Sequence, residues 1–401
     1  MKDILKEAEF MQEELAAYMR TLHQMPEIGM ELPKTTAYIK EKLEEWEVPF
    51  QEYLGGNAMV ATIGGGISER CIALRTDMDA LAIAEETGLS YASANGNMHA
   101  CGHDANMAMM LGAIKLLKRR EKELDRTVKV FFQPNEEGME GARQMIEAGV
   151  LEEHPSDAFL ALHLAQDERY ESGQFMFMAG AMMASADIFD IRLEGEGVHA
   201  AHPETGKDPV TAAAQLIQAV QSMACREFSA LDSVVVSICN MRTRLNDGDD
   251  NRVVYNALPK YVDMAGTIRC LSEDVRKRVI RRMEELTEAT GRMFGIGSTF
   301  QVSPKAPVAV NHAGLTGSLE KVCRGLFGDS AVIMQEEPFM GSEDAACFME
   351  RIPSAYVHLV SNVYQNGRVV PGHHPRYRVD ESVLYRGAAL LAGGALGWKE
   401  R

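Results

Sequence analysis

Cysteine and histidine stand two residues apart in the segment His99-Ala100-Cys101-Gly102-His103-Asp104. A thiolate and an imidazole are good ligands for zinc and similar ions. Gly102 allows the backbone to turn, so that the side chains on either side of it can reach one ion. A buried cysteine beside a capping histidine would have the same sequence. The segment therefore indicates a metal site and leaves a purely structural role open.

Two adjacent carboxylates follow an expected strand. The strand covers 127–133, and Glu136 and Glu137 come after it in a loop bounded by Pro134 and Gly138. Open α/β sheets place ligand sites at such strand ends. One carboxylate could bind a metal ion while the other acts as general base on an activated water. A solvated pair of glutamates is the alternative.

Three further segments have the residue types of a polar site. His163 ends an apolar strand, where a core histidine is the alternative, and His373-His374 precede a proline in a loop or turn. Gly341 and Ser342 begin a turn into a helix, whose free N–H groups could meet an anion. With the two segments above, these supply soft and hard ligands from strand ends and their loops. That combination indicates a dinuclear metal site.

Short strands alternate with amphipathic helices along most of the chain, which predicts an α/β layer with a mixed, mostly parallel sheet. The pattern changes near Ala184, where a strand–helix–strand–strand–helix run predicts a compact α+β unit. We therefore predict one discontinuous α/β domain, residues 1–184 and 297–401, with an inserted domain at 185–296. The expected strands cover 59–64, 71–75, 127–133, 158–163, 188–193, 233–239, 261–268, 300–302 and 355–360. The expected helices cover 8–20, 34–47, 105–118, 140–148, 209–224, 275–294 and 315–326.

Composition narrows the class of protein. The 401 residues are 46% hydrophobic and 25% charged, which is ordinary for a globular chain with a large core. The formal net charge of −17 argues against nucleic acid as a partner. No apolar run reaches the roughly 18 residues of a membrane span, and the charged start does not resemble a signal peptide. The seven cysteines include no CxxC pair, so a reducing cytoplasm is expected.

The chain resembles the aminoacylase/hippurate-hydrolase group of metallopeptidases, which includes the indole-acetyl-amino-acid hydrolases. The resemblance covers nearly the whole chain, in the order and spacing of its motifs. It implies a zinc-exopeptidase-like α/β catalytic domain and an inserted α+β domain that acts as a lid and forms homodimers. The motifs stand at 74–81 (LRTDMDAL), 99–104 (HACGHD), 133–138 (QPNEEG), 197–203 (GVHAAHP), 256–259 (NALP), 341–344 (GSED) and 373–375 (HHP).

The resemblance also implies roles for single residues. Glu136 is expected to be the general base, and Asp77 to orient a metal ligand. His373 is expected to bind metal rather than His374, because the family's ligand stands two residues before the proline. The expected ligands of two divalent ions, which could be zinc, manganese, cobalt or nickel, are Cys101, His103, Glu137, His163 and His373.

The inserted domain contributes further expected site residues. The resemblance implies that His199 stabilises the oxyanion formed at the scissile carbonyl, although His199 could also be a turn residue. Asn256, Gly341 and Ser342 are expected to contact substrate. Arg269 could pair with a substrate carboxylate or could be a strand-surface arginine.

The sequence departs from the family pattern in three places. Asn135 replaces the usual alanine before the glutamate pair, and Ala105-Asn106 replace the usual Gly-His after the Cys-Gly-His-Asp motif. A charged stretch at 242–254 replaces a short glycine-rich loop. No expected ligand is lost, but the substrate pocket is expected to differ from that of any one family member.

The resemblance implies an amidohydrolase that cleaves small N-acyl amino acids, such as N-acetyl or N-benzoyl derivatives, to a carboxylic acid and an amino acid. A dipeptidase, aminopeptidase or carboxypeptidase would use the same metals. The same motifs could also belong to a non-catalytic binding protein on this fold, or to a mononuclear zinc protein in which Cys101 is structural.

Overall fold

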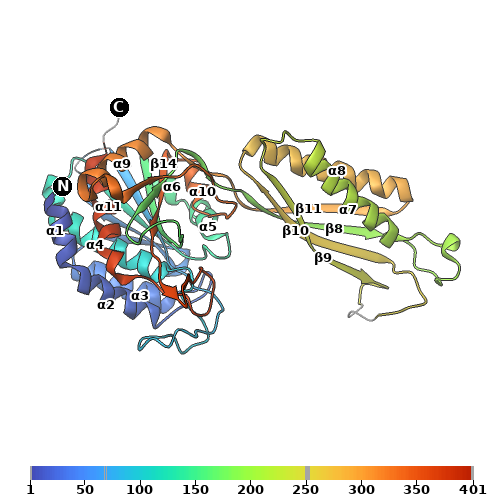
Figure 1. Ribbon diagram of the computed structural model, residues 1–401, viewed down its shortest axis with the longest axis horizontal. Coiled ribbons are helices and arrows are strands. Elements are labelled where there is room, and N and C mark those ends of the chain that lie inside the picture. Colours follow the sequence, from blue (N-terminus) through green and yellow to red (C-terminus); the bar gives the residue numbers. More distant parts are fainter. Residues whose placement is uncertain (1, 67, 69, 249–252, 399–401) are drawn as a thin grey trace. The chain divides into compact units, whose positions relative to one another are not determined.

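The computed structural model describes residues 2–66, 68, 70–248 and 253–398, and the chain divides into two compact units (Figure 1). The larger unit comprises Met1–Gly180, Val310–Glu337 and Asp344–Arg401. The smaller unit comprises Ala181–Ala309 and Pro338–Glu343. Part of the charged stretch 242–254, namely 249–252, lies outside the described residues.

The larger unit contains an eight-stranded mixed sheet. The four strands in its middle, β4, β3, β5 and β14, all run parallel, and β1, β2 and β6 join by antiparallel pairing. In spatial order the strands are β1 (Phe50–Tyr53), β2 (Ala58–Ile63), β4 (Thr127–Gln133), β3 (Cys71–Asp77), β5 (Ala158–Ala165), β14 (Ser354–Val360), β6 (Phe175–Phe177) and β13 (Val332–Met334).

Helices cover both faces of this sheet (Figure 1). One face packs in a single apolar cluster against α1 (Lys2–Phe10), α2 (Gln12–His23), α3 (Pro33–Glu45), α4 (His103–Arg119), α9 (Ala313–Phe327) and α11 (Leu384–Gly397). The other face meets α10 (Ala346–Met349), where Phe348 packs on Phe131 of β4 with ring centroids 5.5 Å apart. The remaining elements are α5 (Gly141–Glu147), α6 (Val150–Glu153), β15 (Tyr364–Gln365) and β16 (Arg368–Val369), and β7 (Gly180–Met183) and β12 (Ala309–Asn311) stand where the chain changes unit.

The local sequence explains the central elements. β3 is buried at every position, as expected for a parallel strand covered on both faces. α4 begins after Gly102, whose φ of 83° favours glycine. A Cβ at Gly102 would also lie 2.8 Å from the hydroxyl of Tyr377. The turn that separates Cys101 from His103 therefore requires a glycine.

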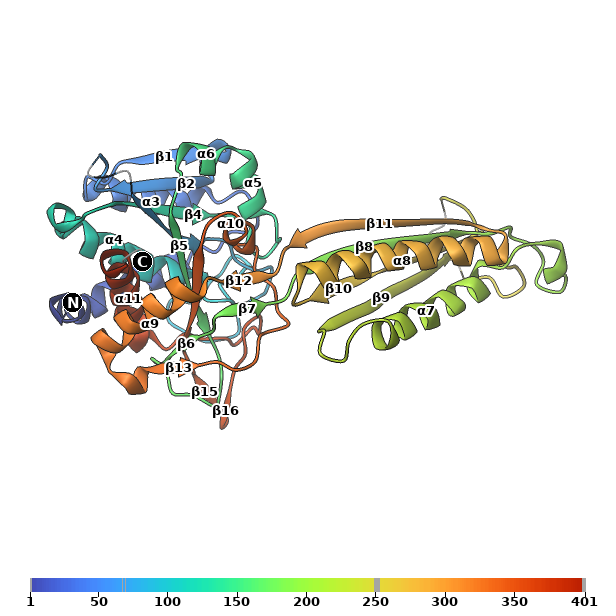
Figure 2. The ribbon, with the colours of Figure 1, turned by 90° about the horizontal axis from the view of Figure 1, so that it is seen from above.

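The smaller unit is an antiparallel four-stranded sheet with two helices on one face (Figure 2). Buried and exposed residues alternate along β8, so one face packs against the helices and the other remains open. Asp208 and Ser272 cap the two helices by accepting main-chain N–H groups. In spatial order the strands are β11 (Gly297–Ala306), β8 (Ala186–Glu194), β10 (Tyr261–Cys270) and β9 (Val234–Arg244), and the helices are α7 (Pro209–Arg226) and α8 (Glu273–Phe294).

One predicted boundary is wrong. The sequence pattern places residues 297–309, including the expected strand 300–302, in the α/β domain, but β11 pairs with β8 along its whole length. Phe300, Gln301 and Val302 alternate apolar and polar types, which identifies a strand but not the sheet that it joins. Exposed residues alternate with half-buried ones along most of β11. The short segment 338–343 also belongs to the smaller unit.

The predicted fold class, a mostly parallel α/β sheet with an inserted α+β unit, is confirmed. Within the described ranges, none of the helices combines the length and apolar character needed to span a bilayer. All seven cysteines are free thiols.

Candidate metal centre

The expected ligands meet at the carboxyl edge of the large sheet. His163 lies near the end of β5, Glu137 follows β4, and His373 lies in the loop after β14. Cys101 and His103 flank the start of α4 after β3. Because these four strands are parallel neighbours, their carboxyl ends and following loops share one edge of the sheet.

Three groups of possible ligands form at this edge in the larger unit. His103, Glu136 and Glu137 make one of them, and the other two share Cys101. Cys101, His103 and His163 make one of these two, and Cys101, Glu137 and His373 make the other. Within each group, one ligand atom per residue lies within 4.8 Å of the others. Cys101 Sγ lies 3.7 Å from His163 Nε2, and His373 Nε2 lies 3.4 Å from Glu137 Oε1. These residues would be able to hold divalent cations, because thiolate, imidazole and carboxylate are suitable ligands.

The hydrogen bonds of both buried histidines leave the same ring nitrogen available. His103 Nδ1 lies 2.8 Å from the carbonyl oxygen of Asp79, and His163 Nδ1 lies 2.6 Å from that of Leu164. A carbonyl only accepts, so each Nδ1 carries a proton and, in the neutral ring, each Nε2 presents a lone pair. His103 Nε2 is buried and has no hydrogen-bond partner among the described residues. The Nε2 atoms of His103 and His163 are therefore suitable ligands for divalent cations.

The charges at the edge favour a cation. Burial lowers the pKa of His103, but the negative charges of Asp77, Glu137 and Asp79 raise it, and the result is a pKa of about 9. Burial, followed by the charges of Glu137, Glu136 and Asp77, raises the pKa of the Cys101 thiol well above its ordinary value. A divalent cation would replace the proton on His103 and stabilise the thiolate of Cys101.

A buried arginine holds the carboxylates behind the ligands. Arg75 donates from Nη1 to Asp77 Oδ2 at 2.8 Å, from Nε to Gln133 Oε1 at 2.9 Å, and from Nη2 to Asp344 Oδ1 at 3.3 Å. Asp344 also accepts from Gln133 Nε2 at 2.6 Å and from the main-chain N–H of Ala142 at 2.9 Å. The expected helix after Gly341-Ser342 begins only at Ala346, so Asp344 lies in the loop before it.

Asp77 stands between this arginine and the ligands. Its Oδ2 lies 4.0 Å from His163 Nε2. Burial raises the pKa of Asp77, but His103, Arg75 and His163 outweigh burial and hold it below the ordinary range. Asp77 is therefore a carboxylate anion that faces the ligand group.

Asn106 connects Asp77 to the strand that carries His163. Its Nδ2 donates to Asp77 Oδ1 at 2.9 Å, and its Oδ1 accepts from the main-chain N–H of Leu164 at 3.3 Å. The side chain is 2% exposed. Neutral histidine, the usual family residue here, also offers one donor and one acceptor. The substitution therefore preserves the hydrogen-bonding roles at this position.

A second aspartate fixes the loop that carries the glutamate pair. Asp79 accepts the main-chain N–H groups of Glu136 at 2.8 Å and Glu137 at 3.1 Å. Burial is the main reason that its pKa rises to about 6. Asn135, the departure from the family's usual alanine, has a φ of 55°. Asparagine tolerates this left-handed conformation better than alanine does.

The two neighbouring histidines near the C-terminus have different surroundings. His373 Nε2 faces Glu137, whereas His374 Nδ1 accepts the main-chain N–H of Arg376 at 3.0 Å within its own turn. His373 has a φ of 62°, and its main-chain N–H donates to the carbonyl oxygen of Ala100 at 2.8 Å. That bond connects the His373 loop to the segment that carries Cys101.

The expected residues of the inserted domain form two groups within the smaller unit. His199 pairs with Ala257 in a short antiparallel bridge, which brings Asn256 beside it. Arg269 Nη1 donates to Ser342 Oγ at 2.9 Å and to the carbonyl oxygen of Met340 at 3.1 Å. The carbonyl oxygen of Gly341 accepts the N–H of Ala184 at 2.9 Å, which holds the Ser342 segment in place.

A family model described as peptidase family M20/M25/M40 matches residues 73–396. The chain belongs to this family. An N-acetyl-L-cysteine deacetylase of Bacillus subtilis is 32% identical over 382 residues, which are 95% of this chain and 87% of that protein. An IAA-amino acid hydrolase of Arabidopsis thaliana is 33% identical over 382 residues, which are 94% of this chain and 83% of that protein.

Solved structures of the family share the fold. The YXEP protein of Bacillus subtilis, described as a dinuclear metal-binding peptidase of the M20 family, has a TM-score of 0.79 and 30% identity over 96% of this chain and 97% of that chain. A candidate aminohydrolase from methicillin-resistant Staphylococcus aureus has a TM-score of 0.90 and 28% identity over 99% of both chains. The resemblance inferred from the sequence is confirmed. The chain is a metallohydrolase of the amidohydrolase branch of the M20 family.

Sequence reasoning missed several residues of the edge. In the sequence, Arg75 and Asp79 stand out only as parts of a motif, and Asn106 only as a departure. Their spacing contains a signal, because Arg75, Asp77 and Asp79 alternate along and beyond a buried strand and so point to one face. His23 gives no such signal. It reaches Asp104 Oδ2 at 2.7 Å from a helix far away in the sequence.

Proposed function

We propose that the chain hydrolyses the amide bond of small N-acyl amino acids to a carboxylic acid and a free amino acid. The observation that carries the proposal is the buried Glu136 carboxylate beside two groups of metal-type ligands. Relatives over nearly the whole chain are N-acetylcysteine deacetylases and IAA-amino acid hydrolases. These names share one substrate class, an amino acid whose amine is acylated.

Glu136 is the proton carrier in this proposal. Its main-chain N–H is held by Asp79, its Oε2 lies 3.8 Å from His103 Nε2, and it is 6% exposed. Two divalent cations held by Cys101, His103, Glu137, His163 and His373 would polarise the amide carbonyl and lower the pKa of a water. Glu136 takes a proton from the attacking water and returns it to the leaving amine nitrogen.

His199 is the proposed hydrogen-bond donor to the oxyanion. Its Nδ1 accepts the main-chain N–H of Ala201 at 3.1 Å, so the ring proton of the neutral form resides on Nε2. The side chain is exposed and its Nε2–H is free to donate. Asn256, beside it, and the Arg269–Ser342 pair are the proposed substrate contacts, with Arg269 suited to a carboxylate.

The variant Glu136→Gln tests the role of the base. We expect the release of free amino acid from N-acetyl and N-benzoyl amino acids to fall by about 10² to 10⁴-fold. Metal content, measured by elemental analysis, should remain near two per chain because the five proposed ligands, Cys101, His103, Glu137, His163 and His373, are unchanged. A loss of metal relative to the parent protein would instead count Glu136 among the ligands, since it also forms a group with His103 and Glu137. Glu147→Gln, a change on the exposed side of α5, is the matched control. Near-normal turnover in Glu136→Gln would overturn the mechanism, and about one metal per chain would favour a mononuclear site.

A carboxypeptidase is the second candidate, because a thermostable carboxypeptidase of Saccharolobus solfataricus is 31% identical over 93% of this chain. Its substrates would be peptides, and a dipeptidase or aminopeptidase would in addition require a free α-amine. Parallel assays with N-acetyl amino acids, N-blocked dipeptides and free dipeptides distinguish the proposed amidohydrolase, a carboxypeptidase, and an enzyme that requires a free α-amine. Faster cleavage of either dipeptide set than of the N-acetyl set would replace the proposed substrate class.

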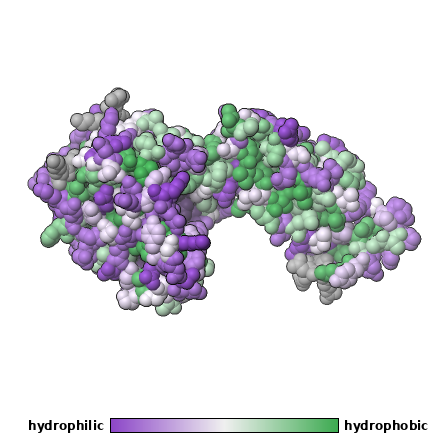
Figure 3. All heavy atoms as spheres, viewed as in Figure 1, coloured by the Kyte–Doolittle hydropathy of each residue, from purple (hydrophilic) through white to green (hydrophobic). Residues whose placement is uncertain are grey.

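We also infer a homodimer formed through the smaller unit. β9 is an edge strand of its sheet, and its open side includes Val235 at 41% and Met241 at 52% exposure. On the face drawn in Figure 3, the surface of the smaller unit carries prominent apolar patches. An unpaired edge with apolar side chains is a template for pairing with a second chain. Sedimentation should give twice the chain mass of 44.2 kDa, and Met241→Lys should lower it. A monomer at all concentrations would contradict this inference.

A further inference from the structure

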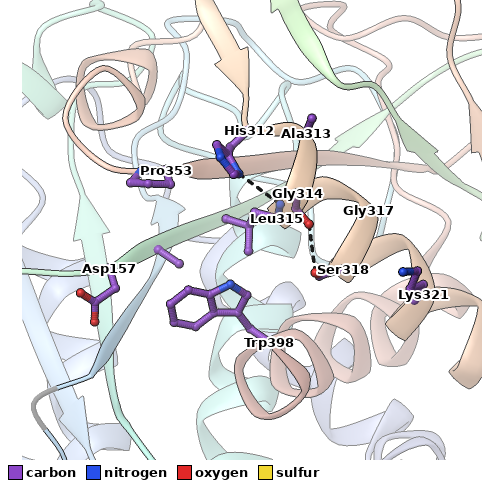
Figure 4. A pocket seen from close by; sticks show the side chains of 11 residues that line it. Asp157, His312, Ala313, Gly314, Leu315, Gly317, Ser318, Lys321, Pro353 and Trp398 are labelled. Carbon is purple, nitrogen blue, oxygen red and sulfur yellow. Dashed lines mark hydrogen bonds between the residues drawn. The ribbon is translucent and has the colours of Figure 1, made fainter. Parts of the chain in front are cut away.

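A cavity of about 440 Å³ lies at the amino edge of the large sheet, where β5 and β14 begin (Figure 4). The metal ligands lie at the opposite, carboxyl edge. Along β5 alone, the distance from Ala158 to His163 is roughly 17 Å at the usual rise per residue. The volume is in the range of small-molecule sites. The cavity is lined by Asp157, Ala158, His312, Ala313, Gly314, Leu315, Gly317, Ser318, Lys321, Pro353 and Trp398.

One part of the cavity is apolar and fixed in place. The indole of Trp398 is 8% exposed, and the guanidinium of Arg126 lies 5.2 Å from its ring centre. Arg126 Nη1 also donates to the carbonyl oxygen of Trp398 at 2.5 Å, which holds that residue at the end of α11. Leu315 and Pro353 line the cavity beside the indole. This part suits a flat or branched apolar group.

The other part offers hydrogen-bond donors that none of the described residues uses. Figure 4 shows the indole nitrogen of Trp398 on the ring edge that faces the first turn of α9. Within the described ranges, this Nε1–H has no hydrogen-bond partner, and Lys321 forms no ion pair. The Trp398 side chain is more than nine-tenths buried, and its unpartnered Nε1–H is open to the cavity, so it can donate to a ligand with an acceptor group.

The first turn of α9 adds further donors. His312 Nδ1 accepts the N–H of Leu315 at 3.2 Å, so in the neutral ring Nε2 carries the proton. The N–H groups of Ala313 and Gly314 precede the first intrahelical bond of α9. The positive end of the helix dipole and the ammonium of Lys321 therefore act on the same space.

One wall of the cavity is negative. Asp157 accepts the N–H of Cys71 at 2.8 Å with Oδ2, and its carboxylate lines the cavity. The Asp157 carboxylate would repel the second negative charge of a dianion. A ligand with one negative charge can place it at the first turn of α9, away from Asp157. The charge pattern therefore favours a monoanion over a phosphate or a dicarboxylate.

We propose that this cavity is a second, non-catalytic binding site for a small monocarboxylate with an apolar or aromatic body. The carboxylate binds the first turn of α9, Trp398 Nε1 and Lys321, and the apolar body packs on the indole. Ligand binding in this cavity is independent of the proposed hydrolysis, because none of the cavity residues belongs to the carboxyl edge.

Tryptophan fluorescence measures the binding directly, because the chain has only two tryptophans. Trp46→Phe leaves Trp398 as the single reporter, and phenylacetate is the probe, titrated into the metal-loaded protein. We expect a saturable change in emission. Phenylacetamide, which has the same shape without the charge, should bind at least about threefold more weakly. Equal binding of the two, or no saturable change, would overturn the proposal.

Two variants in the Trp46→Phe background locate the site. A Cβ at Gly317 would meet nothing within 4 Å, so Gly317→Leu fits the helix and extends into the cavity. We expect Gly317→Leu to weaken phenylacetate binding about tenfold or more. Lys321→Ala, a change of an exposed side chain, should weaken it about threefold and leave phenylacetamide unaffected. Unchanged affinity in folded Gly317→Leu would place the probe elsewhere, including at the metals, and would overturn the proposal. If Gly317→Leu does not fold, an unchanged phenylacetate affinity in Lys321→Ala has the same meaning.

Discussion

The two edges of the large sheet show opposite designs. At the carboxyl edge, Arg75, Asp77 and Asp344 are at most 2% exposed and bond to one another. At the amino edge, Lys321 and His312 are exposed and free to meet a ligand. One edge gathers negative charge and fixes it through buried hydrogen bonds, and the other presents unused donors around a cavity. The carboxyl edge is therefore built rigidly and is intolerant of change, whereas the amino edge tolerates substitution.

The two edges differ because the chain segments that cross them differ in length. The chain between β3 and α4, residues 78–102, crosses the carboxyl edge without a helix of its own. Asp79 of this segment fixes its neighbours, because its carboxylate accepts the main-chain N–H groups of Glu136 and Glu137 and its carbonyl oxygen meets His103 Nδ1. At the amino edge, the connection from α10 to β14 is only residues 350–353. Little chain is therefore available to fill the space beside α9.

Among the substitutions that test this difference, Arg75→Met should reduce the free energy of unfolding the most. Removing the guanidinium leaves Asp77 and Asp344 buried without their cationic partner, which should lower the free energy of unfolding by about 3–5 kcal/mol. Urea unfolding monitored by circular dichroism measures the change. Arg70→Met, at an exposed position just before β3, is the control and should stay within about 0.5 kcal/mol. A loss below about 1 kcal/mol for Arg75→Met would mean that the carboxyl edge is not rigidly built.

The second largest effect is the contribution of His23 to stability, which depends on pH. Burial lowers the pKa of His23, but hydrogen bonds to Asp104 and Glu85 raise it from 6.5 to about 10. The folded protein therefore binds a proton that the unfolded chain releases above pH 6.5. This stability is complete below pH 6.5 and is lost as pH rises toward 10, by at most about 1.4 kcal/mol per pH unit.

His23→Gln should remove that dependence. We expect the variant to be less stable by about 2–3 kcal/mol near pH 7, and the difference from the parent protein to shrink as pH approaches 10. Unfolding in urea at pH 6.5, 8 and 9.5 provides the measurement. A difference that is constant across this range would show that His23 is not charged in the folded protein.

The sequence predicted the ligand types of the carboxyl edge because their spacing has chemical meaning. Glu137 and His163 stand at or just after the ends of β4 and β5, and parallel strands bring such ends together. Most bounds of the elements that were expected agree within a few residues, since hydrophobic periodicity determines them. Helix α11 was not predicted, and the expected helix 8–20 is two helices, α1 and α2. β11 is predicted in the wrong unit, because periodicity identifies a strand but not the sheet that it joins.

The amino-edge cavity had no local signal in the sequence. Asp157, Gly317 and Trp398 come from three distant segments, and none belongs to a motif. A void arises where packed elements fail to meet, which depends on side-chain volumes across the fold rather than on any one pattern. His23 escaped notice for a related reason, since its partner Asp104 is remote in the chain.

The third effect concerns the connection between Asp77 and β5. Asn106→Leu leaves Asp77 Oδ1 and the N–H of Leu164 without their partner, which should cost about 1–3 kcal/mol of stability. Metal affinity should fall about 10 to 100-fold, because the carboxylate that faces His163 loses its anchor.

Asn106→His is the matched comparison. Neutral histidine can donate to Asp77 and accept from Leu164, so we expect metal affinity within about threefold of the parent protein. Competition with a chelator of known affinity measures both variants. Equal loss in Asn106→His and Asn106→Leu would show that side-chain volume, not the hydrogen-bond pair, matters at this position.

The smallest effect tests the tolerance of the amino edge. Gly317→Ala adds a methyl group where nothing lies within 4 Å, inside helix α9. Alanine is the better helix former, so the free energy of unfolding should rise by about 0.5–1 kcal/mol with turnover unchanged. Gly387→Ala in α11 is the contrasting change, because its Cβ would collide with the thioether of Met109, and it should destabilise the protein. Paired thermal melts and activity assays distinguish the two, and a loss of stability in Gly317→Ala would mean that the amino edge is as tightly built as the carboxyl edge.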